Sequence, residues 1–150
     1  MALAIFDPVS LIGGKFSVGK LLGIKADDPL QLVRFIERGF SFDALERLKR
    51  ETGLPLERLA TAIGISPRTL TRRKKENKLT ASESDRLVSI SRLLALSIEL
   101  FEGDTIKAVR WLTTASRALG SVPPLEMAAT ETGSREVENL IGRLEHGVFS

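Results

Sequence analysis

LERLATAIGISPRTLTRRKK, residues 56–75, is the stretch that decides the fold. It predicts two short helices joined by a tight turn, which is the helix-turn-helix arrangement. Ala60 is small enough to let the second helix approach the first, and Gly64 tolerates the left-handed backbone that such a turn requires. Ser66 and Pro67 are typical of an N-cap followed by the first residue of a helix. The apolar residues expected to lock the two helices together are Leu59, Ile63, Ile65 and Leu70.

The second of these helices is strongly basic, as expected of a helix that enters the major groove of DNA. Arginine can pair with guanine through two hydrogen bonds, threonine can contact thymine methyl groups, and lysine can follow the phosphates. Arg73 stands where this motif often has an apolar residue, so Leu79 or the next helix is expected to supply the missing packing. The predicted DNA contacts are Arg68, Thr69, Thr71, Arg72, Arg73, Lys74, Lys75 and Lys78.

The charge of the chain is unevenly distributed. Residues 1–43 are neutral, whereas residues 44–80 carry ten basic and four acidic side chains. Residues 81–150 carry seven basic and ten acidic side chains. A basic middle suits nucleic acid, and the acidic end indicates a different partner for that part of the chain. A solvated charged helix remains the alternative for the basic run, although solvated faces usually mix the two signs.

Helical periodicity continues in both directions from this motif, and the chain is predicted to be all-α. Asp28 and Pro29 favour a helix start, and Thr80 to Glu83 have the form of a capping box that opens a long helix. A short helix after Pro124 is expected to close near Gly133. The remaining predicted helices begin near Ser41, Asp104 and Ser134. The expected organisation is an N-terminal helical arm (1–40), a helix-turn-helix domain (41–80), and a linking helix with a small C-terminal helical domain (81–150).

Several classes of function find no support in the sequence. The chain has no cysteine, which excludes disulfides, thiolate zinc sites and cysteine nucleophiles. His146 is the only histidine, and neither a catalytic triad nor a phosphate-binding glycine loop is present. We therefore expect no enzyme activity, no metal and no cofactor. Asp7 and Pro8 interrupt the apolar N-terminal stretch, so neither a secretion signal nor a membrane span is predicted, and a cytoplasmic protein is expected.

An ordered series of short motifs runs through residues 20–150. Its main members are ISPRTLTRRK (65–74), LTASESDRL (79–87), FEGD (101–104), WL (111–112), ALG (118–120), PPLE (123–126) and the closing run TGSREVENLIGRLEHG (132–147). Each motif alone has little specificity, but the series resembles the Xre/MbcA/ParS antitoxins. The resemblance implies a toxin-binding C-terminal domain, a RES-domain toxin that consumes NAD as the partner, and repression of the protein's own operon by DNA binding.

The resemblance also implies a homodimer and a toxin-binding surface. The apolar residues of segments 30–38 and 81–100 are more than one thin layer can bury, which favours the dimer. The polar face of the last helix and the tail that follows are expected to hold the toxin. The predicted contacts are Arg135, Glu136, Asn139, Arg143, Glu145, His146, Val148 and Phe149. Two alternatives stay open: Phe149 could fold back onto its own domain, and the chain could be a stand-alone dimeric transcription regulator.

Overall fold

The computed structural model describes residues 17–26 and 28–147 of the 150-residue chain. The described helices are α2 (Val18–Leu22), α3 (Pro29–Arg38), α4 (Asp43–Thr52), α5 (Leu56–Ala62), α6 (Pro67–Glu76), α7 (Ala81–Leu100), α8 (Thr105–Leu112), the 3-10 helix η2 (Arg117–Leu119), α9 (Pro124–Met127) and α10 (Glu131–Glu145). Within these residues the only pairings of the β type are two isolated bridges, and strands are absent. The all-α prediction is therefore confirmed.

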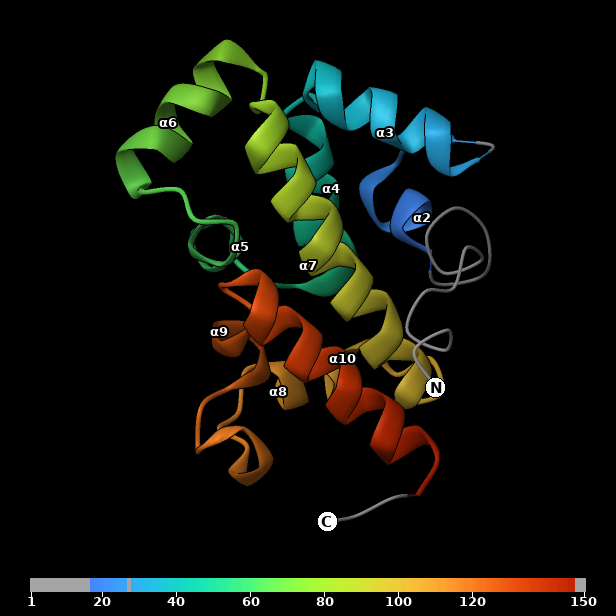
Figure 1. Ribbon diagram of the computed structural model, residues 1–150. Coiled ribbons are helices and arrows are strands. Elements are labelled where there is room, and N and C mark those ends of the chain that lie inside the picture. Colours follow the sequence, from blue (N-terminus) through green and yellow to red (C-terminus); the bar gives the residue numbers. More distant parts are fainter. Residues whose placement is uncertain (1–16, 27, 148–150) are drawn as a thin grey trace.

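The long helix α7 is the centre of the molecule, and other helices lie along it (Figure 1). It packs against α2, α3, α8 and α10. Leu87, Ile90 and Leu93 on α7 are fully buried. The part of the dimer argument that rested on residues 81–100 is therefore wrong, because the chain buries the apolar residues of this helix within itself.

Side-chain caps begin several helices where the sequence predicts them. Asp28 accepts a hydrogen bond from the Gln31 backbone at 2.9 Å, and Asp104 caps α8 in the same way. The capping box at the start of α7 is complete, with Thr80 and Glu83 each bonding the other's backbone nitrogen. Such caps satisfy amide groups that have no partner inside the helix. These helix starts are confirmed.

The beginning of α10 differs from the prediction. The helix starts at Glu131 with Thr130 as its cap, and Gly133 lies inside its first turn and does not end α9. A Cβ atom at Gly133 would collide with the carbonyl oxygen of Met127, the last residue of α9. Glycine is therefore required here because the end of α9 passes directly against the first turn of α10.

One hydrophobic core runs through the described residues, from α2 to α10. Arg86 of α7 adds hydrogen bonds that link segments on different sides of this core. Its Nη2 atom donates to the carbonyl of Ala62 at the end of α5 and to those of Ala128 and Ala129 beyond α9. The expected arm at residues 1–40 is only partly described, and its helices α2 and α3 pack on α4 and α7. None of the helices in the described ranges is long and apolar enough to cross a membrane.

Candidate nucleic-acid interface

Helices α5 and α6 form the predicted helix-turn-helix. Leu59, Ala60 and Ile63 are buried, and Ile65 in the turn is 8 % exposed. The Ile65 amide donates to the Ala60 carbonyl at 2.9 Å, which closes the turn. Gly64 has a φ of +81°, and a Cβ there would meet nothing within 4 Å. Glycine is thus favoured for its backbone conformation and not for lack of space.

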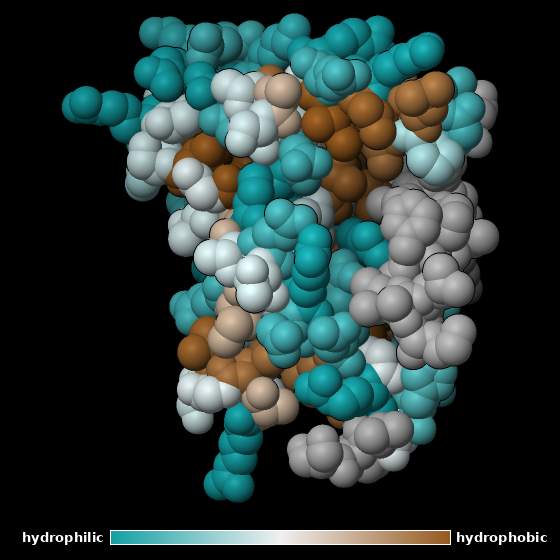
Figure 2. All heavy atoms as spheres, viewed as in Figure 1, coloured by the Kyte–Doolittle hydropathy of each residue, from teal (hydrophilic) through white to brown (hydrophobic). Residues whose placement is uncertain are grey.

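The recognition helix α6 presents a basic outer face. Ser66 caps it, and Pro67 is its first residue, as predicted. The exposed side chains of this face recur at helical spacing, and they are Arg68, Thr71, Arg72 and Lys75. Figure 1 shows α6 at the edge of the molecule, away from α8 and α10, and Figure 2 shows hydrophilic side chains gathered over that edge. This is a geometry in which one helix can lie in a groove of DNA.

Three other predicted contacts surround this face. Thr69 is half-buried, and its hydroxyl lies 3.1 Å from the hydroxyl of the cap residue Ser66. Lys74 is exposed on the flank of α6. Lys78 is exposed just beyond the end of the helix, after Asn77 takes a left-handed conformation with a φ of 55°. Thr69 is therefore placed to support the start of α6, whereas the two lysines can approach phosphates on either side.

Arg73 does not belong to the outward face, so its assignment as a DNA contact stays a prediction without support from the position of its side chain. Its side chain is 15 % exposed, whereas that of Arg72 is 60 % exposed. The Arg73 guanidinium pairs with Glu83 of α7, from Nε to Oε1 at 2.7 Å and from Nη2 to Oε2 at 3.0 Å. The packing expected from the following helix is thus supplied by an ion pair, and Leu79 is buried in the core.

Electrostatics fix the charge state of this pair. Burial by itself raises the pKa of Glu83, but hydrogen bonds from Arg73 and from the Thr80 backbone, together with the charge of Arg73, outweigh it and hold the pKa below its usual value. The hydrogen bond to Glu83 raises the pKa of Arg73. The pairing of Glu83 with Arg73, ten residues apart, has no signature in the sequence, although the capping box had already placed Glu83 at the start of α7.

The second predicted surface lies on α10. Its buried side is formed by Val137, Leu140 and Ile141, so the opposite side faces outward. The structure brings five predicted residues to that outward side, namely Arg135, Glu136, Asn139, Arg143 and His146. Val148 and Phe149 lie outside the described residues.

The flank of α10 that faces α7 carries two carboxyl groups. Glu138 pairs with Arg92 of α7 at 3.3 Å. Burial raises the pKa of Glu138, and the charges of Arg92 and Arg135 offset this only in part. Partial burial and the nearby charge of Glu99 also raise the pKa of Glu145, while His146 lowers it. Glu145, another predicted contact, is exposed near the end of α10, and Glu99 of α7 lies close to it.

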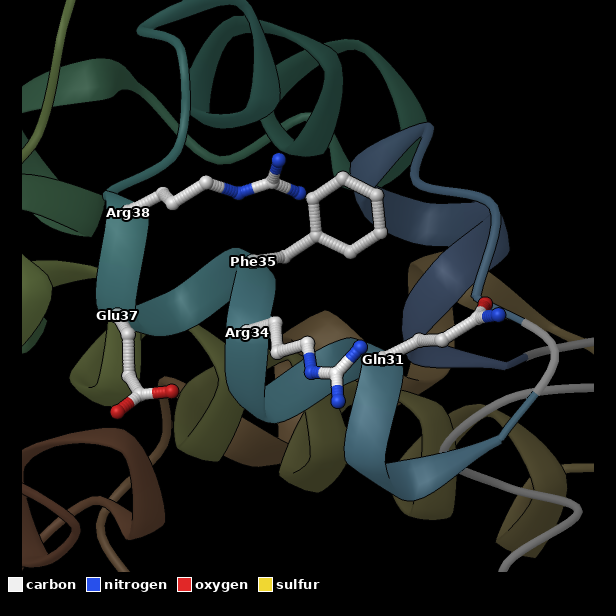
Figure 3. Close-up of a pocket in the computed structure, with 5 residues that line it drawn as sticks. All are labelled: Gln31, Arg34, Phe35, Glu37 and Arg38. Atoms are coloured by element: carbon white, nitrogen blue, oxygen red, sulfur yellow. The ribbon is translucent and has the colours of Figure 1, made fainter.

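Helix α3 carries two features that the sequence did not single out as a site. Leu30 and Val33 are 59 % and 48 % exposed, and Figure 2 shows hydrophobic side chains gathered where α3 lies beside α7. A shallow, open pocket of about 690 Å³ lies next to them. Figure 3 shows Arg38 reaching over the ring of Phe35, at 4.8 Å from its centroid. The described lining residues are Gln31, Arg34, Phe35, Glu37 and Arg38, which form no arrangement for catalysis.

Comparison with known proteins identifies both halves of the chain. Residues 31–92 match the family described as the antitoxin Xre-like helix-turn-helix domain. Residues 97–147 match the antitoxin Xre/MbcA/ParS C-terminal toxin-binding domain. An antitoxin Xre of Yersinia enterocolitica is 39 % identical over 130 residues, which cover 86 % of this chain and 88 % of that protein. An antitoxin Xre of Photorhabdus laumondii is 43 % identical over 88 residues, covering 58 % of this chain and 60 % of that protein.

Proposed function

This chain belongs to the family of Xre antitoxins, and we propose that it neutralises an NAD-consuming RES-domain toxin and represses its own operon. Its helix-turn-helix domain binds DNA and its C-terminal domain binds the toxin. Both activities would take place in the cytoplasm, where the operon DNA lies, and the protein itself would catalyse no reaction.

The observation that carries this proposal is the separation of the two surfaces. The basic face of α6 lies at one edge of the molecule, and the outward side of α10 lies in its other half (Figure 1). Helix α7 runs between them and packs on α10 directly. Toxin on α10 would therefore leave α6 exposed, so that one molecule could hold toxin and DNA at once. A complex that binds its own promoter in this way is suited to autoregulation.

The nature of the toxin is supported by the ordered motifs that run through residues 20–150. Their resemblance to antitoxins that pair with RES-domain toxins favours an NAD-consuming partner. On this proposal the outward side of α10, with Arg135, Asn139 and Arg143, covers the active site of the toxin. The tail residues Val148 and Phe149 would add an aromatic anchor, because a buried aromatic side chain often dominates binding energy at an interface.

The proposal includes a homodimer. A single helix-turn-helix contacts few base pairs, and two-fold dimers on paired half-sites are the usual solution. Leu30 and Val33 on α3 are two of the three large, exposed hydrophobic side chains in the described residues. Burying this pair against a second copy would remove apolar surface from water and hold two recognition helices together.

Co-expression with the neighbouring reading frame of the operon tests this function. The partner is expected to co-purify in a fixed ratio, and the cellular NAD level is expected to stay normal. Deleting residues 147–150 should leave the antitoxin folded and able to bind DNA, but NAD should fall. If no partner co-purifies and NAD never changes, the chain is a stand-alone regulator. If the truncated chain still protects NAD fully, the toxin is inhibited through α10 without the tail.

A further inference from the structure

The recognition helix is held to the rest of the molecule by few side chains. None of its residues is fully buried, and its one large apolar residue, Leu70, is only partly covered. Most helices in this fold are fixed by buried leucine or isoleucine side chains. The direction in which α6 points must therefore depend strongly on its polar contacts.

The strongest of these contacts is the two-pronged ion pair between Arg73 and Glu83. Both side chains are largely buried, at 15 % and 11 % exposure. The remaining guanidinium nitrogen, Nη1, donates to Glu76 of α6 at 3.2 Å. Every side-chain nitrogen of Arg73 thus donates to a carboxylate of the protein. A bidentate pair of this kind fixes orientation as well as distance, because both groups are planar.

Glu83 is itself held rigidly by the first turn of α7. Its Oε1 atom accepts from the Thr80 backbone nitrogen at 3.0 Å, and its own amide donates to Thr80 Oγ1 at 3.1 Å. The Glu83 carboxylate therefore completes the capping box of α7 and also binds Arg73 of α6. Because α7 is the buried centre of the fold, this links the recognition helix to the most firmly packed element.

We propose that Glu83 is the positioning residue of the recognition helix. Acting through Arg73, it sets the angle at which Arg68, Arg72 and their neighbours meet DNA, and it withholds the Arg73 guanidinium from the phosphates. This inference rests on the proposed reading of operator DNA by α6. Where the motif often has an apolar residue, this chain has Arg73, and its ion pair takes the place of apolar packing. The partner, Glu83, lies on α7, the helix that leads to the toxin-binding domain.

The test measures the affinity for the native promoter and for random DNA at several salt concentrations. These data distinguish positioning of α6 from a direct contact of Arg73 with phosphate. Glu83→Gln keeps the shape of the side chain but loosens Arg73. We expect the ratio of specific to random affinity to fall at least about tenfold. We also expect the salt slope on random DNA to steepen by about 0.9, the value for one more neutralised phosphate. Arg73→Met should have the same salt slope on random DNA as the wild-type protein.

Two further variants complete the test. Glu51→Gln is the control, because it removes an exposed carboxylate that pairs with Arg47 within α4, so the specificity ratio should not change. The double variant Arg73→Met/Glu83→Met replaces the ion pair by an apolar one. It should recover most of the specificity, and it keeps the test open if Glu83→Gln alone unfolds.

Three results would overturn parts of the account in distinguishable ways. If Arg73→Met flattens the salt slope by about 0.9, Arg73 contacts a phosphate and the inference fails. If Glu83→Gln folds and keeps the wild-type specificity ratio, Glu83 does not position α6. If the wild-type protein does not prefer the native promoter over random DNA, the proposed reading of the operator fails, and the inference fails with it.

Discussion

Arg72 and Arg73 are neighbours in the sequence, yet one faces solvent and the other faces a carboxylate of another helix. Helical geometry turns consecutive side chains by about 100°, so Arg72 can share the outward face with Thr71 while Arg73 is turned toward α7. The sequence assigns both arginines to DNA, because periodicity alone does not show which of them turns inward. The partner, Glu83, is fixed by the packing of α6 on α7, which leaves no trace in the local sequence.

At this scale the first prediction concerns Arg68 and Arg72. Replacing either by alanine should weaken binding to the native promoter by roughly 1–3 kcal/mol if it pairs with guanine through two hydrogen bonds. Preference for the native sequence should relax at the same time. Gel-shift titration measures both effects. The ion pair of Arg72 with Glu76 spans 3.8 Å and is well exposed, so its loss should cost the fold little.

Lys75→Ala is the matched control on the same face. A lysine that meets phosphates should weaken all DNA binding about equally and flatten the salt slope by roughly 0.9. An unchanged affinity for the native promoter in the Arg68→Ala/Arg72→Ala double variant would show that α6 is not the recognition helix.

The second prediction follows from the lowered pKa of Glu83. A carboxyl group whose pKa is lower in the folded than in the unfolded state stabilises the fold at pH values above its unfolded pKa, here about 4.5. This stabilisation is lost as the pH falls through the folded-state pKa. The free energy of unfolding of the wild type should therefore exceed that of Glu83→Gln at neutral pH. The difference should shrink below pH 4.5. Urea denaturation of both proteins across this range measures it.

Glu138→Gln provides a control with the opposite sign. Because burial raises the pKa of Glu138, the folded state binds its proton more tightly than the unfolded state does. As the pH falls toward the ordinary pKa of a glutamate, the wild type should thus gain stability relative to Glu138→Gln. A parallel response of the two variants to pH would contradict the assignment of the charges.

At the scale of helices, the sequence predicts most starts because caps are local, and it misplaces the start of α10. Thr130 and Ser134 are both suitable N-caps. The choice between them depends on how the end of α9 packs against the next turn, which is a contact in space. Gly133 appeared to end a helix because glycine often does, but its role is to make room for the Met127 carbonyl.

The third prediction uses two glycines of the same helix. Gly133→Ala should lower the free energy of unfolding by about 1–3 kcal/mol, because its Cβ would press on the Met127 backbone. Gly142→Ala, where no atom lies within 4 Å of the new Cβ, should raise it by up to about 1 kcal/mol through better helix propensity. Thermal or urea unfolding measures both. A loss at Gly142 equal to that at Gly133 would contradict the described packing of α9 on α10.

For the whole molecule, the sequence predicts an all-α chain with a basic helix-turn-helix domain and a separate acidic C-terminal region. It does not predict that α7 would be enclosed on several sides, because amphipathic spacing shows which residues are apolar and not how many neighbours cover them. Two of the three large hydrophobic side chains that remain exposed in the described residues, Leu30 and Val33, lie on α3 instead. The hydrogen bonds of Arg86 to three carbonyls of distant segments are likewise visible only in the folded chain.

The fourth prediction concerns the assembly of two copies. The wild type should have the mass of a dimer in light scattering at micromolar concentration, and Leu30→Ser/Val33→Ser should shift it to monomer. Ile106→Ser is the matched control, since Ile106 is 71 % exposed on α8, away from this face, and its loss should leave the dimer intact. A monomer mass for the wild type, with and without its partner, would contradict the dimer.

The central claim is that one antitoxin can hold toxin and DNA at once, because α10 and α6 are separate surfaces. A gel shift of the native promoter with the purified toxin–antitoxin complex tests it most directly. We predict a band that migrates more slowly than that of antitoxin alone and contains both proteins. The Arg68→Ala/Arg72→Ala complex should lose this band while keeping its toxin. Release of the promoter whenever toxin binds would contradict the claim.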